Sequence, residues 1–89
     1  MKSISIFGFT GSIGSQALDI IKKHQESFEI DVFVCNENID KAINLINDHK
    51  PKNVFIFNSI ARLKIIERCS NEINFFQSYN DLREHISTN

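Results

Sequence analysis

Apolar residues along the chain alternate between short strand-like runs and longer stripes with helical spacing. Three runs are rich in branched and aromatic residues, as strands are: Ser3–Phe7, Phe28–Cys35 and Val54–Phe57. After each run, apolar residues recur at intervals of three and four, which predicts a helix. The three helices are expected at residues 12–25, 39–49 and 60–66, and Asn38 and either Asn58 or Ser59 are suited to cap the second and third.

The C-terminal part has a weaker pattern. Residues 72–76 alternate like an edge strand, and Ser78 is placed to cap a short helix that runs to Ile86. Strands that alternate with helices favour a parallel sheet with right-handed crossovers. We therefore predict an α/β fold: a Rossmann-like parallel sheet with helices on both faces, a half-domain of three to four strands in the order 4-3-2-1. Ser3–Phe7 would then form an exposed apolar edge, and we hypothesise that the isolated chain is marginally stable or self-associates there.

Length and charge limit the possible functions. A chain of 89 residues forms one domain, and its ten basic and eleven acidic residues give a net charge of −1. Because there is no basic patch and no apolar run of about 20 residues, we expect neither a nucleic-acid partner nor a membrane span. Cys35 and Cys69 fit neither a metal spacing nor a disulfide scaffold, and no signal peptide is visible, so a cytoplasmic location is expected.

The candidate chemistry lies in a glycine-rich turn between the first strand and the first helix. Gly8, Gly11 and Gly14 follow the strand at intervals of three. In dinucleotide-binding folds the first glycine allows a tight turn, the second lets the backbone approach the pyrophosphate, and the third lets the helix pack closely against the strand. N–H groups at the start of the helix would form an anion site. Thr10 and Ser12 add hydroxyls that can reach phosphate oxygens, and Ser12 can also cap the helix. The alternative is a tight turn that binds nothing.

A second contact region is expected where the second strand ends, beside the first. A carboxylate at this point binds the adenosine ribose and favours NAD, whereas a basic residue accommodates the 2′-phosphate of NADP. Glu37 taken alone therefore favours NAD. Alternatively, Glu37 points to water and Asn36 and Asn38 make the contacts, although Asn38 is also a plausible helix cap.

No catalytic set of residues can be assembled from the other titratable side chains. The three histidines, at positions 24, 49 and 85, are far apart in sequence and are expected to be partly exposed helix residues. Asp31 lies at the opposite end of its strand from the glycine turn and is expected to be solvated.

The residues of the glycine segment, beyond the glycines themselves, resemble those of a known family. Thr10-Gly11-Ser12-Ile13-Gly14, followed by Gln16-x-Leu18-Asp19, resembles the N-terminus of the 1-deoxy-D-xylulose 5-phosphate reductoisomerases. Similarity continues at Phe28-Glu29, at Asn38 and at Lys50-Pro51-Lys52, and it weakens toward Ile86.

The resemblance implies an NADPH-dependent enzyme that converts 1-deoxy-D-xylulose 5-phosphate to 2-C-methyl-D-erythritol 4-phosphate in non-mevalonate isoprenoid biosynthesis. It also implies a divalent metal, magnesium or manganese, and a homodimer in full-length members of the family. The cofactor-contacting positions that it implies are Thr10, Gly11, Ser12, Ile13, Asn36, Glu37 and Asn38.

The chain departs from the family pattern in three residues and in length. Phe9 replaces a small residue, Asn36 stands where glycine is common, and Glu37 stands where a basic or small polar residue is common. Residues 1–89 are expected to form a partial NADPH-binding domain without the catalytic and C-terminal domains, without metal ligands, and inactive as an isolated chain. The alternatives are a non-catalytic nucleotide-binding module and a fragment of another NAD(P)-dependent dehydrogenase.

Overall fold

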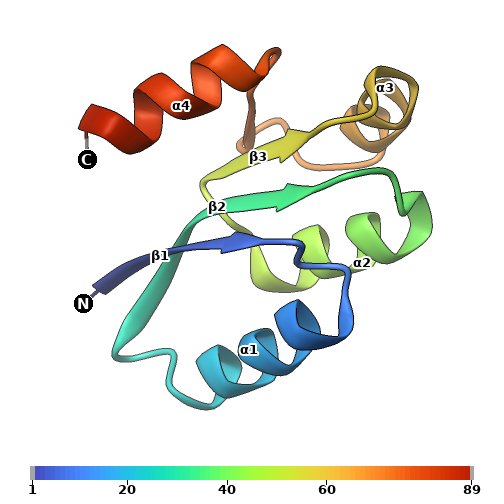
Figure 1. Cartoon of the computed structure of the whole chain (residues 1–89). Coiled ribbons are helices and arrows are strands. Elements are labelled where there is room, and N and C mark those ends of the chain that lie inside the picture. The colour runs from blue at the N-terminus through green and yellow to red at the C-terminus, as the bar shows by residue number, and fades with distance from the viewer. Residues whose placement is uncertain (1, 89) are drawn as a thin grey trace.

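The structure is a computed structural model that describes residues 2–88, without the side chains of Ser12 and Thr88. Strands and helices alternate along the described chain (Figure 1). Their bounds are β1 Lys2–Phe7, α1 Ser12–Lys23, β2 Phe28–Cys35, α2 Ile39–His49, β3 Asn53–Ile56, α3 Ser59–Glu67, β4 Asn74–Phe75 and α4 Tyr79–Thr88.

One parallel sheet contains the four strands in the order β1-β2-β3-β4. This confirms the predicted α/β class and the order 4-3-2-1. The fourth strand is shorter than the alternation of residues 72–76 indicates, because only Asn74 and Phe75 pair with β3. The sheet therefore has one short edge at β4 and one longer edge at β1.

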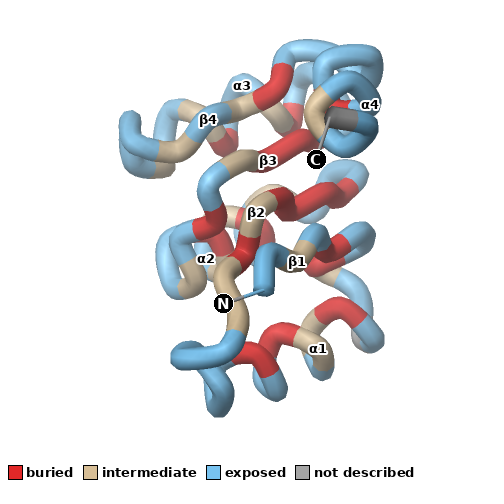
Figure 2. Tube along the Cα trace, turned by 90° about the vertical axis from the view of Figure 1, so that its left-hand side faces the viewer, coloured by how far each residue is buried: buried red, intermediate tan, exposed pale blue. Residues whose placement is uncertain are grey.

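Helices cover both faces of the sheet, as predicted. On one face, α1, α2 and α3 pack against Ile6, Phe33 and Ile56 in the larger core. On the other face, Leu82 of α4 packs against Val32, Val34 and Phe55 in a smaller core. Buried residues lie along β2 and β3, whereas most of β1 is exposed or half-buried (Figure 2).

Polar residues at the helix starts explain where the later helices begin. The side chain of Asn58 accepts a hydrogen bond from the N–H of Ala61 at 2.9 Å, and Ser78 accepts one from Asp81 at 3.1 Å. Both satisfy N–H groups that have no intrahelical acceptor, as expected from the sequence. Asn38 occupies the N-cap position of α2 but makes no side-chain cap bond.

A bulge in β2 changes the environment of Asp31. The pairing of β1 with β2 shifts between Ile4 and Ser5, so that β2 has one extra residue at this point. Oδ2 of Asp31 lies 2.9 Å from Nε2 of His85 on α4, and Oδ1 of Asp31 accepts a hydrogen bond from the amide of Asn53 at 2.8 Å. The expectation of a solvated Asp31 was therefore wrong: this carboxylate connects α4 to the sheet.

Candidate functional site

The two predicted contact regions lie next to each other at the carboxyl edge of the sheet. The N–H groups of Gly8 and Phe9 donate to the carbonyl of Val34, at 2.7 and 3.3 Å. These bonds attach the turn that follows β1 to the last residues of β2. The fold thus places the start of the glycine turn beside the end of β2, the strand that residues 36–38 follow.

The three glycines occupy backbone positions that other residues would strain. Gly8 has φ +72°, in the left-handed region, where a side chain is disfavoured. A Cβ on Gly14 would meet the carbonyl oxygen of Gly8 and would lie 2.8 Å from Cα of Phe9. A Cβ on Gly11 would lie 3.3 Å from the Gly8 oxygen, and the N–H of Gly11 donates to that oxygen at 2.9 Å. The tight turn and the close helix packing expected of Gly8 and Gly14 are therefore present.

The position of the Phe9 side chain explains how a large ring fits into such a tight turn. Its side chain is fully buried, and its ring stacks on Phe33 of β2 with the centroids 4.5 Å apart. The ring therefore faces the larger core, away from the outer surface of the turn. Sequence reasoning treated Phe9 as a departure from a family pattern, whereas the structure makes it an anchor for the turn.

The start of α1 presents backbone N–H groups at the surface. Gly11 is the N-cap, and the first α1 N–H with an intrahelical acceptor is that of Ser15, which donates to Gly11 at 2.9 Å. The expectation that Ser12 caps the helix was wrong, and the Ser12 side chain lies outside the described atoms. Ile13 is largely exposed and Thr10 is half-buried. N–H groups at the amino end of a helix, here one of twelve residues, carry a partial positive charge that in general favours anions such as phosphate.

The second turn is fixed by its backbone and open at its side chains. The N–H groups of Phe57 and Asn58 both donate at 3.0 Å, to the carbonyls of Cys35 and Asn36, so the two residues that follow β3 hold this turn in place. Asn36, Glu37 and Asn38 all have exposed side chains. Asn38 occupies the N-cap position of α2, but its side chain makes no hydrogen bond to the N–H groups at the start of that helix.

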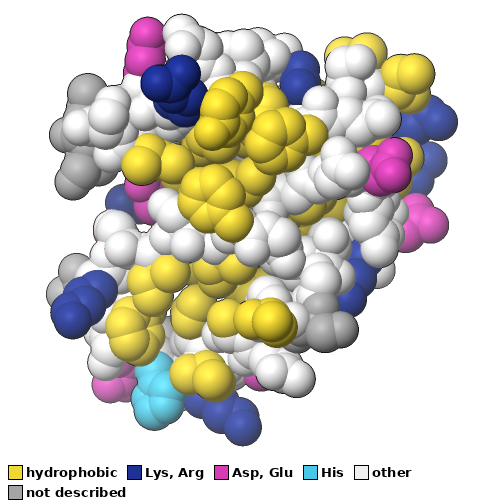
Figure 3. All heavy atoms as spheres, in the orientation of Figure 1, with side chains coloured by type: hydrophobic (Ala, Val, Ile, Leu, Met, Phe, Trp, Pro, Cys, Tyr) yellow, Lys and Arg dark blue, Asp and Glu magenta, His cyan; other side chains and the backbone are white. Residues whose placement is uncertain are grey.

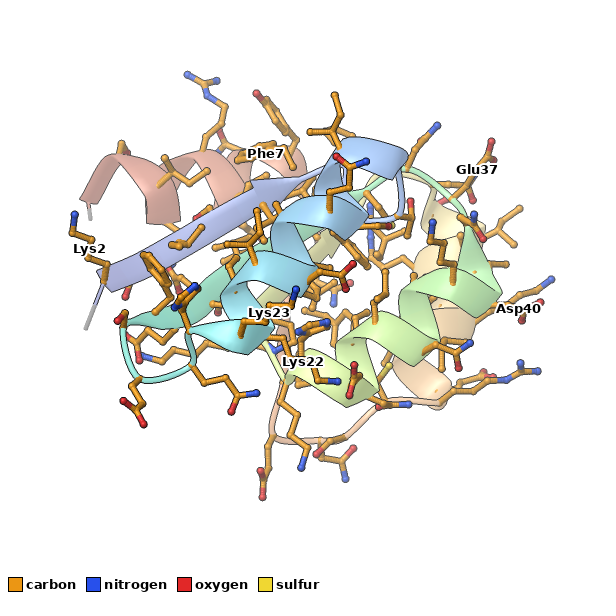
Figure 4. The ribbon with its side chains drawn as sticks, turned by 90° about the horizontal axis from the view of Figure 1, so that it is seen from below. Lys2, Phe7, Lys22, Lys23, Glu37 and Asp40 are labelled. Atoms are coloured by element: carbon orange, nitrogen blue, oxygen red, sulfur yellow. The ribbon has the colours of Figure 1, made fainter. Side chains whose placement is uncertain are left out.

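Glu37 gives this turn its charge. Figure 4 places Glu37 and Asp40 at the end of the molecule opposite Lys2. None of the ion pairs found among the described residues includes Glu37. Cys35, just before the turn, is buried, and burial raises the pKa of its thiol to about 12, so it is unsuited to act as a thiolate.

Both turns carry groups that can pair with parts of a dinucleotide. The N-terminus of α1 fits a pyrophosphate, which needs N–H donors. The glycines allow α1 and the turn to pack closely against each other. The second turn fits a ribose, because carboxylate and amide groups pair with hydroxyls.

Two further findings concern the described residues as a group. Within residues 2–88 there is no cluster of three His, Cys, Asp or Glu side chains that could hold a metal ion. No helix in the same range is long and apolar enough to cross a bilayer.

One polar atom near the turn was not identified by sequence reasoning. The hydroxyl of Ser15, in the first turn of α1, is buried without a hydrogen-bond partner among the described atoms. Nothing in the sequence around this serine, which follows Gly14, indicates whether its hydroxyl is exposed or buried.

Comparison with known proteins gives a consistent result. Residues 4–89 match the family model described as 1-deoxy-D-xylulose 5-phosphate reductoisomerase. The reductoisomerase of Clostridium kluyveri is 38% identical over 72 residues, which cover 81% of this chain and 19% of that protein. The reductoisomerase of Pelagibacter ubique is 36% identical over 92 residues, covering 100% of this chain and 23% of that protein.

Solved structures agree in fold. A crystal structure of DOX-P reductoisomerase in complex with NADPH, fosmidomycin and magnesium superposes with a TM-score of 0.82 at 22% identity, over 94% of this chain and 21% of that one. A second, in complex with magnesium, gives 0.71 at 26% identity, over 84% of this chain and 20% of that one. The chain thus spans about one fifth of the length of these proteins.

Proposed function

The chain belongs to the 1-deoxy-D-xylulose 5-phosphate reductoisomerase family, and from this premise we propose that residues 1–89 are the first part of its NADPH-binding domain. In this proposal the α1 N-terminus and the glycine turn bind the pyrophosphate, through Thr10, Gly11, Ser12 and Ile13. The turn after β2 binds the adenosine ribose, through Asn36, Glu37 and Asn38. When bound, NADPH supplies the hydride for reduction.

The observation that carries the proposal is the hydrogen-bonded junction between the two turns. The carbonyl of Val34 accepts from both Gly8 and Phe9 and so ties the turn after β1 to the end of β2. These are the two regions that the proposal assigns to phosphate and ribose. The fully buried ring of Phe9, which stacks on Phe33, fixes the first turn to the core. Such preorganisation reduces the entropy that binding would otherwise cost.

Glu37 is expected to reduce the preference of the chain for NADPH over NADH. A carboxylate about 6 Å from a phosphate of charge about −2 repels it by about 1.4 kcal/mol in water, which is a factor of about ten in affinity. Hydrogen bonds from Glu37 to ribose hydroxyls favour NADH. The proposed binding preference for NADPH over NADH is therefore small in this chain.

Calorimetric titration of the chain with NADPH and with NADH tests the proposal. Saturable binding of NADPH, reduced by Gly14→Ala through displacement of α1 from the turn, is the expected result. As a control, Glu72→Gln changes an exposed residue on the loop before β4 and leaves binding unchanged. Absence of binding would favour the alternative of a βα turn that binds nothing.

We further propose that the isolated chain does not turn over substrate. It corresponds to about one fifth of the relatives it matches, and the family resemblance implies that the metal-binding carboxylates and the substrate-phosphate site lie in parts of the enzyme beyond this match. An assay with 1-deoxy-D-xylulose 5-phosphate, NADPH and manganese should show no NADPH oxidation above background. Binding of NADPH without oxidation would match a non-catalytic nucleotide-binding module, and measurable oxidation would contradict the proposal.

A further inference from the structure

Three aromatic rings form a continuous row on the α1 and α2 side of the sheet. The ring of His49, at the end of α2, meets the ring of Phe33 edge-on at a centroid distance of 6.1 Å. Phe33 in turn stacks on Phe9, with the two ring planes 18° apart. Phe33 and Phe9 are fully buried, and only 8% of the His49 side chain is exposed. The row therefore lies in the interior, apart from the hydrophobic side chains that gather at the surface in Figure 3.

The row of rings connects the two opposite edges of the sheet. Phe9 belongs to the glycine turn at the carboxyl edge, whereas His49 ends α2 at the amino edge, shortly before β3 begins. Cα of Phe9 is also one of the atoms that leave no room for a side chain on Gly14. Because closely packed interiors transmit small displacements, a change at His49 is expected to reach the glycine turn through Phe33.

The charged groups around His49 compensate a positive charge on its ring only in part. Nε2 of His49 lies 3.7 Å from Oδ2 of Asp48, which is too far for a hydrogen bond. Nζ of Lys22 already binds that carboxylate at 3.0 Å and repels a charged imidazole. Asp19 of α1 attracts such a charge, but more weakly than Asp48 does. Three further charged side chains border the same hollow as His49: Glu29, Lys50 and Lys52.

The position of His49 therefore favours its neutral form. Burial lowers the pKa of His49, because an imidazolium at this position loses its hydration. The opposing attraction of Asp48 is screened by water, since half of that side chain is exposed. At 6.1 Å, Phe33 lies at the limit of a cation–π contact and recovers little of the cost. The hollow beside His49, of about 360 Å³, gives a charged ring room to turn toward Asp48 and water.

We propose that His49 is a positioning residue for the phosphate-binding turn, and that protonation of its ring weakens dinucleotide binding there. The neutral ring supports Phe33, which holds Phe9 and with it the glycine turn. The charged ring turns toward water and leaves a space beside Phe33, so the turn loses part of the order that it has before binding. The proposal rests on the dinucleotide site proposed above and adds a dependence on pH to that site.

The direction of the effect separates this route from simple charge attraction. A positive charge on His49 would by itself attract phosphate and strengthen binding as the pH falls. Loss of support from the row of rings acts in the opposite direction and weakens binding. Since coupling between two sites is reciprocal, a bound dinucleotide should in turn lower the pKa of His49 further.

NMR of the chain without ligand tests the row of rings by itself. Between pH 7.5 and 5.5, the amide signals of residues 8–14 should shift with the same midpoint as the His49 ring. His49→Phe keeps an aromatic ring that does not titrate, so these shifts should disappear in that variant. His24→Gln is the matched control, because His24 is an exposed histidine at the end of α1, and it should leave the shifts unchanged. Shifts that persist in His49→Phe would overturn the proposal.

Calorimetric titration with NADP⁺ at pH 7.5 and 5.5 tests the effect on binding. Relative to His49→Phe, the unaltered chain should lose about fivefold in affinity at the lower pH, which is the lower end of typical coupling between sites. Titration of the 2′-phosphate of the ligand is common to both proteins and cancels, and His24→Gln should behave like the unaltered chain.

Two results would overturn the proposal: the same pH dependence in the unaltered chain and in His49→Phe, or a relative affinity that rises at the lower pH. Absence of NADP⁺ binding to every variant at pH 7.5 is a different result. It would overturn the cofactor role itself, and the effect of His49 on binding with it.

Discussion

Substitution of Gly14 by alanine gives a stringent test of how α1 is held against the turn. The new Cβ would lie 2.8 Å from Cα of Phe9 and 3.0 Å from the carbonyl carbon of Gly8. Ordinary contacts begin near 3.4 Å, so Cα of Phe9 must move away by about 0.6 Å, and the carbonyl oxygen of Gly8, which would be closer still, must move farther. Both neighbours are backbone atoms, which cannot rotate away, and Phe9 is further fixed by its ring on Phe33.

The expected magnitude is the difference between two opposing effects. Overpacking of this kind costs about 1–3 kcal/mol, whereas alanine in place of glycine favours a helix by up to about 1 kcal/mol. We expect a net loss of about 1–2 kcal/mol in the free energy of unfolding. For a chain of this size, each kcal/mol lowers the melting midpoint by about 4–8 °C.

The assay is urea unfolding followed by circular dichroism, with Gly11→Ala as the matched control. At Gly11 the new Cβ would lie 3.3 Å from a single oxygen, which a shift of about a tenth of an ångström relieves, so the loss should stay below about 1 kcal/mol. Equal stability of Gly14→Ala and Gly11→Ala would contradict this reasoning. It would show that the close contact between α1 and the turn does not require glycine at position 14.

Further predictions concern four other residues. Phe9→Ala should cost about 3–5 kcal/mol in urea unfolding, because it removes a fully buried ring; a loss below 1 kcal/mol would contradict its role as an anchor. Glu37→Lys should raise the ratio of NADPH to NADH affinity, measured by calorimetry, by at least about tenfold, and an unchanged ratio would show that Glu37 lies away from the cofactor. Burial lowers the pKa of His49 in the folded chain, so unfolding at pH 7.5 and 5.5 should show stability lost as the pH falls below the unfolded value of about 6.5, and His49→Gln should reduce that loss. The Cys35 thiol, with its pKa raised by burial, should react with a thiol reagent only after unfolding; fast reaction of the native chain would show that the end of β2 opens.

Local sequence signals predicted most of the fold. The apolar runs of β2 and β3 and the stripes of α1 and α2 gave the correct alternation, and the caps at Asn58 and Ser78 are present. Strand order also followed, because right-handed crossovers with short connections leave few alternatives. The candidate site was predictable in its position, since parallel strands place the turns after β1 and β2 at one edge.

Features that depend on contacts distant in sequence were not predictable. Phe9 was missed as a core residue because its ring meets Phe33, 24 positions away, and its turn carries no strand or helix period. Asp31 was missed because a bulge, which leaves no mark in the apolar pattern, brings it to His85 of α4. The cap of α1 fell on Gly11 because the backbone bond from Gly11 to Gly8 closes the turn one residue earlier than a serine cap would require.

We propose that a dinucleotide binds where the turns after β1 and β2 meet. Two-dimensional ¹H–¹⁵N NMR of the chain, titrated with NADPH, tests this most directly because it reports each backbone amide separately. We expect saturable shifts at residues 10–14 and 36–38, with little change at residues 70–73, which lie outside the proposed site. Shifts confined to other parts of the chain, or no saturable shifts at all, would contradict it.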